Sequence, residues 1–207
     1  MIGALAPALP GKVPAASAGE LLVLAFGGRT REGERYVVGE LIAGGSGASQ
    51  GKDGIDVIET DATNCMNLPV EAMEMDAPIR IHRSALRRDS GGAGEFRGGL
   101  GIVREYEILG GEVSFSHRGE RHFSAPKGLA GGGGGAMARS IIRRAGGGEE
   151  VIPSKIVTVL KPGDRVIVET AGGGGYGAPE GRAPERLRED VENGKISEAA
   201  RSARRSF

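Results

Sequence analysis

Two short polar segments carry the side chains best suited to chemistry in this chain. The first contains Asn64, Asn67 and Glu71, with Cys65 between the two amides, in a loop that leads into a helical turn. The amides can order the loop through Asx turns, or they can hydrogen-bond a substrate ring, and both interpretations stay open. Glu71 or Glu74 can serve as a general base only if burial raises its pKa. Cys65 is more typical of a small packing residue than of a nucleophile.

The second segment runs from Arg118 to Arg121 and is flanked by His117 and His122. Two arginines with Glu120 between them can hold a phosphorylated intermediate or a substrate carboxylate through bidentate hydrogen bonds. The alternative is a solvated surface ion pair. Histidine is a candidate acid or base near neutral pH, although a single histidine is more often structural. The candidate residues are therefore Glu71 and His117 for catalysis, and Asn64, Asn67, Arg118 and Arg121 for substrate binding.

Glycine is the compositional anomaly. It supplies 38 of 207 residues, against a usual share of about 7%, and it lacks the strict three-residue repeat of collagen. The main blocks are Asp89–Gly101, Pro126–Gly135 and Gly172–Gly175. Their N–H groups could cradle phosphate, but none has the Gly-Lys-Ser/Thr ending of a P-loop. We expect instead that these glycines form tight turns and pack closely against another chain.

Charge and composition exclude several classes of protein. Lys+Arg and Asp+Glu are equal at 27 each, so no net field draws the chain to nucleic acid or an anionic membrane. Aromatic residues are too sparse for a base-stacking platform. A single cysteine makes no internal disulfide and no zinc cluster. With no apolar run long enough to span a membrane and no signal peptide, we expect a cytoplasmic protein.

The body of the chain is predicted to be rich in β-strands. Apolar runs or alternating patterns indicate strands at 21–26, 36–42, 79–83, 102–108, 113–116, 140–144, 156–160 and 165–170, with a short strand at 56–60. Gly33, Gly110–Gly111 and Pro162–Asp164 are turn signals. They predict three hairpins, of which the pair around Pro162–Asp164 is the best supported.

The last part of the chain changes to a charged, helical composition. Pro184 near a helix start and Gly194 at its end predict one helix, and Ser197 is placed to cap a second. The expected fold class is α+β, with a β-rich body of antiparallel hairpins and glycine-rich loops over residues 1–180. Residues 181–207 form the short C-terminal helical tail.

Three blocks in this order resemble the hydantoinase B/oxoprolinase family. Residues 64–71 are similar to the family's Asn-x-x-Asn-Thr-Pro-Val-Glu segment, with Leu68 in place of Thr. The second block is the glycine-rich stretch Asp89–Gly101. The third combines Pro153–Lys155, Lys161–Asp164 and Thr170–Gly177. One glycine block alone is weak evidence, but the ordered set covers nearly the whole chain.

This resemblance implies ATP-dependent opening of a cyclic amide such as a hydantoin or 5-oxoproline. In the family an A-type component is thought to phosphorylate the amide oxygen, and the B-type component completes the hydrolysis. Phosphorylation helps because an amide is a poor electrophile and the phosphorylated oxygen becomes a leaving group. The alternatives are a part of a related ATP-dependent ketone carboxylase, and a non-catalytic structural or assembly module or truncated remnant.

The resemblance also implies that the chain is only the C-terminal portion of a B-type component. The similarity begins near the middle of longer relatives, whose N-terminal half carries metal-binding His and Asp residues. With only His82, His117 and His122, this chain shows no metal site of its own. We expect ATP and a divalent metal in the full assembly but no cofactor held by this chain. The expected partners are an A-type ATPase subunit and the N-terminal B segment, in a hetero-oligomer, and the chain alone is expected to be inactive.

Overall fold

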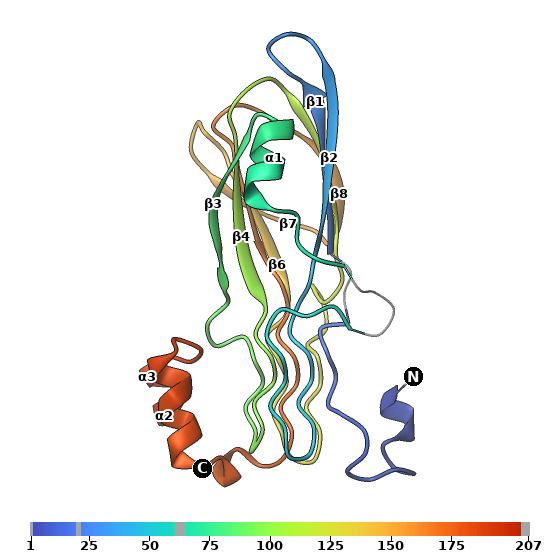
Figure 1. Ribbon diagram of the computed structural model, residues 1–207, viewed down its shortest axis with the longest axis vertical. Coiled ribbons are helices and arrows are strands. Elements are labelled where there is room, and N and C mark those ends of the chain that lie inside the picture. Colours follow the sequence, from blue (N-terminus) through green and yellow to red (C-terminus); the bar gives the residue numbers. More distant parts are fainter. Residues whose placement is uncertain (1, 20–21, 61–64, 204–207) are drawn as a thin grey trace.

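The computed structural model describes residues 2–19, 22–60 and 65–203. In these residues nine strands form two antiparallel sheets that lie face to face (Figure 1). The strand order is β2-β1-β5-β8 in the four-stranded sheet and β3-β4-β9-β6-β7 in the five-stranded sheet. The strands are β1 (Leu22–Arg29), β2 (Arg35–Ile42), β3 (Ile79–Leu86), β4 (Ile102–Ile108), β5 (Val113–Arg118), β6 (Arg139–Arg143), β7 (Glu149–Ile152), β8 (Lys155–Leu160) and β9 (Arg165–Glu169). The β-rich α+β class is confirmed.

The helices are short and lie outside the two sheets. They are α1 (Val70–Asp76), α2 (Pro184–Glu192) and α3 (Glu198–Ala203), with 3-10 turns η1 (Ile2–Leu5) and η2 (Pro179–Gly181). The expected helix signals are confirmed: Pro184 begins α2, Gly194 follows it with φ +68°, and the Ala200 N–H donates to Ser197 Oγ at 3.1 Å. No helix in the described part of the chain is long and apolar enough to cross a membrane.

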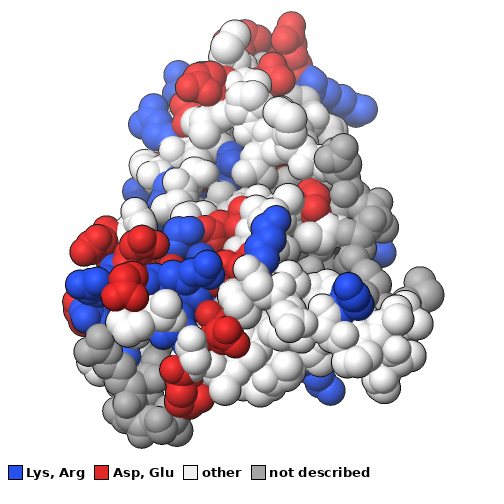
Figure 2. Space-filling model, turned by 60° about the horizontal axis from the view of Figure 1, so that its bottom comes forward, with Lys and Arg blue, Asp and Glu red and all other residues white. Residues whose placement is uncertain are grey.

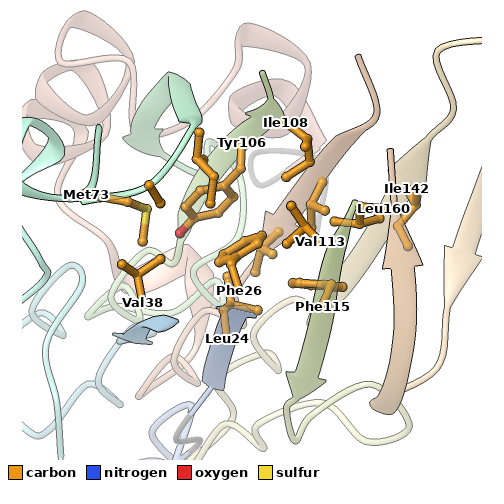
Figure 3. Close-up of a cluster of buried hydrophobic side chains, with 14 of the residues drawn as sticks. Leu24, Phe26, Val38, Met73, Tyr106, Ile108, Val113, Phe115, Ile142 and Leu160 are labelled. Carbon is orange, nitrogen blue, oxygen red and sulfur yellow. The ribbon is translucent and has the colours of Figure 1, made fainter. Parts of the chain in front are cut away.

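The hydrophobic core fills the space between the two sheets (Figure 3). Alternate residues point inward, so β1 contributes Leu24 and Phe26, and β5 contributes Val113 and Phe115. The Phe26 ring lies 5.0 Å from the Phe115 ring and 5.4 Å from the Tyr106 ring, centroid to centroid. The core therefore joins the sheets through interdigitated side chains, as in a β-sandwich.

One expected hairpin is confirmed. β1 and β2 pair along their whole length, across a turn in which Gly33 has φ +88°. The strand expected at 56–60 is wrong, because the described residues there form only an isolated bridge between Gly44 and Ile58. The apolar pair Val57 and Ile58 gave the strand signal, but Val57 packs on the core from a loop.

The other two expected hairpins are wrong. β4 lies in the five-stranded sheet and β5 in the four-stranded sheet; β8 and β9 are divided in the same way. Gly110–Gly111 and Pro162–Asp164 therefore carry the chain from one sheet to the other. The two crossings are bonded together, because Ile108 N donates to Asp164 O at 3.0 Å and Gly163 N donates to Ile108 O at 2.7 Å. A turn sequence reverses the chain without determining whether the flanking strands pair or stack.

The glycine-rich segments form a second body below the sandwich in Figure 1, where extended ribbons without strand arrows run side by side. Residues 171–177 show the arrangement best. Successive N–H groups from Gly172 to Gly177 donate to carbonyls of residues 136, 99, 16, 133, 96 and 129, at 2.8 to 3.2 Å. From Gly172 to Tyr176 the neighbouring segment changes with a period of three residues, which is the period of a polyproline II helix, and the repeat ends at Gly177. We call this body, residues 13–19, 43–57, 89–101, 126–136 and 171–177, the glycine bundle.

Glycine is required in the bundle because the backbones are in contact. A Cβ on Gly173 would lie 1.8 Å from Ser46 O, and one on Gly98 would lie 2.0 Å from Gly173 O. The glycines are closely packed, but against other segments of the same chain, so the expected packing against another chain stays a prediction. A tight turn is present at the start of Asp89–Gly101, where Ser90 N donates to Arg87 O at 3.3 Å, but its residue of positive φ is Asp89 and not a glycine.

Candidate functional site

The residues that follow β5 contain the best placed candidates for chemistry. His117 and Ser140 lie on opposite sheets, on β5 and β6, and both side chains point into the sandwich. His117 Nε2 lies 2.8 Å from Ser140 Oγ, which is 3.5 Å from His122 Nε2. The two imidazole rings meet edge to face, with centroids 5.3 Å apart. We call these three residues the His117–Ser140–His122 cluster.

The surroundings fix the proton position of His122 but not that of His117. His117 Nδ1 is buried without a well-aligned hydrogen-bond partner among the described residues, while the Ser154 backbone favours a proton on the ring. His117 Nε2 and Ser140 Oγ share a hydrogen bond in which either atom can be the donor, depending on the tautomer. His122 Nδ1 lies 2.7 Å from Glu120 O, so this nitrogen carries a proton. His122 Nε2 is left as the acceptor for the Ser140 hydroxyl.

Burial separates the roles of the two histidines. His117 is 1% exposed, and its burial, with a smaller effect of the nearby His122, lowers the pKa of His117 to about 4, while the Ser154 backbone opposes the shift. His117 is therefore neutral at pH 7. His122 is half-buried and lines an open pocket of about 610 Å³. Of the two histidines, only His122 meets a space that a ligand can enter.

The pocket beside His122 has an apolar floor and a basic rim. Phe123, Met137 and Val151 are exposed there, and Arg87 and Arg139 lie at its edge. Arg87 donates to Met137 O at 2.6 Å and to Thr170 O at 2.9 Å and pairs with Glu169 at 3.2 Å. Arg139 is half exposed and lies 3.6 Å from Glu149. We call this hollow the His122 pocket.

The two predicted arginines do not converge on one ligand position. Arg118 points outward from β5 and is exposed. Arg121, with φ +56°, turns toward the glycine bundle and donates to Ala18 O at 2.6 Å and Ser17 O at 3.2 Å. Glu120 pairs with Lys155 at 3.1 Å, both side chains being largely exposed. The structure therefore brings His117 and His122 together and separates Arg118 from Arg121.

The first predicted segment lies elsewhere, around the start of α1. Asn64 lies outside the described residues, whereas Asn67 is half-buried and Cys65 is exposed. Glu71 is exposed in the first turn of α1. Glu74 accepts a hydrogen bond from Ile81 N at 2.8 Å, which ties α1 to β3. Neither glutamate is in the buried environment that a raised pKa requires.

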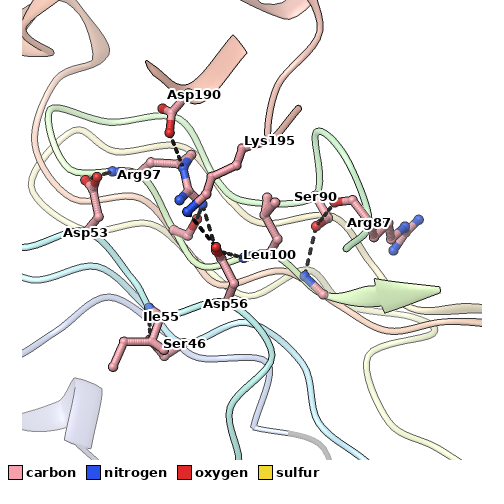
Figure 4. Close-up of polar contacts among 12 residues, drawn as sticks. Ser46, Asp53, Ile55, Asp56, Arg87, Ser90, Arg97, Leu100, Asp190 and Lys195 are labelled. Carbon is pink, nitrogen blue, oxygen red and sulfur yellow. Dashed lines mark hydrogen bonds and ion pairs between the residues drawn. The ribbon is translucent and has the colours of Figure 1, made fainter. Parts of the chain in front are cut away.

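Sequence reasoning missed a buried ionic network between the glycine bundle and α2 (Figure 4). Arg97, 2% exposed, donates to Asp190 and Asp56, each at 3.2 Å. Arg182 continues the network to Asp190 at 2.8 Å and to Asp53 at 2.8 Å. Burial alone would raise the pKa of Asp53, but the hydrogen bond and charge of Arg182 outweigh burial and hold it below its ordinary value. The sequence feature that could have indicated this network is Arg97, an arginine within the glycine-rich stretch Asp89–Gly101.

Phosphate and metal ions were the two further ligand classes to consider in the described part of the chain. The N–H groups of Gly172–Gly175 are used in the bundle, so they do not form a phosphate cradle. Among residues 2–19, 22–60 and 65–203, no three His, Cys, Asp or Glu side chains are grouped to hold a metal ion. Around α2 and α3, Figure 2 shows charges of both signs intermixed, which leaves no patch of one sign there.

Comparison with known proteins gives the wider context. The family model for hydantoinase B/oxoprolinase matches residues 1–179. The B-type subunit of a putative D-/L-hydantoinase from Pseudomonas sp. is 34% identical over 95% of this chain and 33% of its own length. The 5-oxoprolinase of Dictyostelium discoideum is 34% identical over 67% of this chain and 11% of its own length. The chain thus spans about a third or less of these relatives.

Solved structures agree. The ATP-dependent caprolactamase from Pseudomonas jessenii has a TM-score of 0.80 and 28% identity, over 99% of this chain and 40% of that one. A nucleotide-free acetone carboxylase has the same fold, with a TM-score of 0.78 at 20% identity over 93% of this chain and 30% of that one. Because the family model covers most of the sequence, the chain belongs to the hydantoinase B/oxoprolinase family.

Proposed function

We propose that this chain is the C-terminal part of the B-type subunit of an ATP-dependent cyclic-amide hydrolase, working with an A-type ATPase subunit. The observation that carries the proposal is the family match over residues 1–179. Two relatives are named as single subunits of larger enzymes, a hydantoinase and a caprolactamase, which supports a partner subunit. In this proposal ATP and a divalent metal belong to the full assembly and are held by its other parts.

Within this function the chain supplies a rigid wall and one group that can exchange a proton. The sandwich and bundle hold the His117–Ser140–His122 cluster by contacts from both sheets. Neutral His117 orients the Ser140 hydroxyl, and Ser140 orients His122 toward the pocket. His122 is the member of the cluster that can exchange a proton with a ligand in the His122 pocket. His117 is therefore a positioning residue.

The test is a chimera of the beta subunit of Pseudomonas jessenii caprolactamase in which the matching region is replaced by residues 1–207. The chain alone should not open caprolactam in the presence of ATP. The chimera, co-expressed with its partner subunit, should assemble and show ATP-dependent ring opening, measured by release of the amino acid. Turnover by the chain alone contradicts the proposal, and so does a chimera that does not assemble.

The role of His122 has its own test in the active chimera. His122→Gln should lower kcat, because the group that exchanges the proton has been removed. His82→Gln is the matched control, since His82 pairs with Glu107 on the outer face of the five-stranded sheet. Equal kcat values for the two variants would remove His122 from the reaction.

A further inference from the structure

The centre of the outer face of the four-stranded sheet is made of small and apolar residues, between charged side chains such as Arg118 and Lys155 at one end and Arg29 and Arg35 at the other. Two rows cross its centre in register, Val37-Gly27-Ser114-Val159 and Gly39-Ala25-Ser116-Val157. No residue in either row is charged. The valines are the largest side chains in these two rows, and Val37, Val157 and Val159 are 80%, 72% and 51% exposed. We call these eight residues the small-residue face.

The outer face of the five-stranded sheet is of the opposite kind. Its central apolar residues, Val103, Ile141 and Ile167, are buried. Ion pairs surround them: Glu105–Arg165 at 3.0 Å, Arg143–Glu149 at 2.8 Å, Arg87–Glu169 at 3.2 Å and His82–Glu107. Long charged side chains cover apolar surface while their ends remain in water. That face is suited to solvent, whereas the small-residue face has no such cover.

Two glycines of the small-residue face are not required by contacts within the chain. A Cβ on Gly27 would lie 3.7 Å from Val37 Cγ2, and one on Gly39 would lie 3.4 Å from Leu24 O, both ordinary contacts. Neither has a positive φ. Glycine inside a strand weakens it and often marks the close approach of another backbone. Within the described residues, no close backbone approach of this kind accounts for Gly27 or Gly39.

The face is also large and hollowed. Four strands spaced about 4.8 Å apart, with two central rows, present an apolar surface on the order of 300 Å², the size of the largest patches that monomers usually leave exposed. Over Gly27 and Gly28 the surface dips into a hollow of about 820 Å³, with Arg29, Arg35 and Glu112 at its edge. Missing side chains thus create a recess that an incoming segment can fill.

We propose that the small-residue face is covered by the part of a B-type polypeptide that the relatives carry beyond the region matched here. This inference rests on the proposed function. The same fold occupies 40% of the caprolactamase chain, and the sequence match spans 33% of the hydantoinase relative, so a larger remainder must pack beside it. The ion-paired face is already covered by its own side chains. The small-residue face allows the close, dry contact typical of an interface within one polypeptide.

Cysteine accessibility tests this contact directly. The chain has one cysteine, Cys65, which is exposed, so Cys65→Ser provides a background for single reporters. Ser116→Cys places a thiol at the centre of the small-residue face, and Arg143→Cys is the control on the opposite outer face. In the chain alone both thiols should react with a maleimide. In the caprolactamase chimera, Cys at 116 should react at least about tenfold more slowly because interface cores exclude water, with little change at 143.

A second pair of variants separates folding from docking. Gly27→Ala and Val157→Glu should each leave the Tm of the isolated chain nearly unchanged or, for Gly27→Ala, raise it, because neither side chain meets an obstacle there. In the chimera both should reduce the yield of the assembled enzyme, Val157→Glu the more strongly. Assembly that tolerates both variants would overturn the docking.

The outcomes distinguish this inference from the proposed function. A chimera that assembles but leaves the 116 thiol reactive overturns the docking and keeps the function. A chimera that does not assemble overturns the function. If the thiol at 116 is protected only when the partner subunit is present, the partner subunit covers the face. If it is protected in the isolated chain, and the chain sediments as a dimer, a second copy covers the face. Either result overturns the occupant proposed above.

Discussion

The sandwich and the glycine bundle are stabilised in opposite ways within one chain. In the sandwich, Phe26, Tyr106 and Phe115 interlock between two sheets whose backbones are held apart by side chains. In the bundle, the backbones themselves are in contact, and hydrogen bonds leave the central segment in three directions. The bundle therefore gains little from side-chain burial and depends on hydrogen bonds and close backbone contact.

This difference determines how each body responds to mutation. A side-chain core can adjust rotamers around an altered residue, and its losses scale with the atoms removed. Backbone atoms have no rotamers, so a single methyl group in the bundle must displace whole segments. The same methyl group on a strand such as β1 meets no obstacle at Gly27. The glycines of the two bodies thus carry very different constraints.

The largest effect is expected at the centre of the bundle. Gly173→Ala would place a Cβ 1.8 Å from Ser46 O and 2.8 Å from Gly47 N. Because both neighbours are backbone atoms, we expect a loss of more than about 4 kcal/mol, enough to prevent folding of a marginally stable domain. Circular dichroism and urea denaturation would measure it.

Gly146→Ala is the matched control, because a Cβ there meets nothing within 4 Å and its φ is not positive. It should change the free energy of unfolding by no more than about 0.5 kcal/mol. A Gly173→Ala protein as stable as Gly146→Ala would show that the bundle can shift to accept side chains.

The sequence predicted where the strands lie better than it predicted which strands pair with one another. An apolar run located β1 and alternation located β3, since apolar runs and an inward-facing side are visible in the order of residues. It could not show which sheet each strand enters, because the turns at Gly110–Gly111 and Pro162–Asp164 suit both a hairpin and a crossing between sheets. The bundle was not predicted for a similar reason. Its three-residue period describes which segment each backbone N–H bonds to, and this period is not visible in the positions of the glycines along the sequence.

The candidate site was only partly predictable. His117 and His122 could be selected from a charged segment after a strand, but Ser140 comes from a distant strand with no motif of its own. Arg97 and Asp190 also lie far apart in the sequence, and the fold alone makes them a pair. Side chains brought together across the sheets, or between the bundle and the tail, leave no spacing signal.

The next largest loss of stability is expected for a substitution in the core of the sandwich. Phe26→Ala removes a fully buried ring that touches two other rings, and we expect a loss of about 3–5 kcal/mol. Phe26→Leu should cost much less because it keeps most of the volume. Urea denaturation of both variants tests this graded response. An all-or-none response, as severe for leucine as for alanine, would erase the contrast with the bundle.

Acid should weaken the two regions at different pH values. Protonation of His117 favours the unfolded chain, since its pKa is about 4 when folded and about 6.5 when unfolded. Stability is therefore lost as the pH falls from about 6.5 to about 4, by up to about 3 kcal/mol. The network between the bundle and α2 should persist through that range, because Asp53 and Asp56 have lowered pKa values and lose their charge only below the ordinary Asp range, about 4.

His117→Asn should flatten the loss of stability between pH 6.5 and 4.5, measured by urea denaturation at several pH values. Arg182→Gln should leave that slope in place and instead expose α2 to proteolysis at neutral pH, since Asp53 and Asp190 lose their partner. An unchanged slope in His117→Asn would mean that another group controls the acid response.

A small effect, above only that of the Gly146→Ala control, is expected at a glycine of a third kind. Gly33 has φ +88° in the turn between β1 and β2, and a Cβ there meets nothing within 4 Å. Gly33→Ala should therefore cost only the strain of a left-handed backbone, about 1 kcal/mol, and Gly33→Asn should cost less because Asn tolerates that conformation. Thermal unfolding of the two variants measures the difference. If Gly33→Ala were as damaging as Gly173→Ala, backbone conformation and not backbone contact would be the main reason for glycine in this chain. The expected order, Gly173 far above Gly33 and Gly33 above Gly146, attributes the glycine content chiefly to the packing of the bundle.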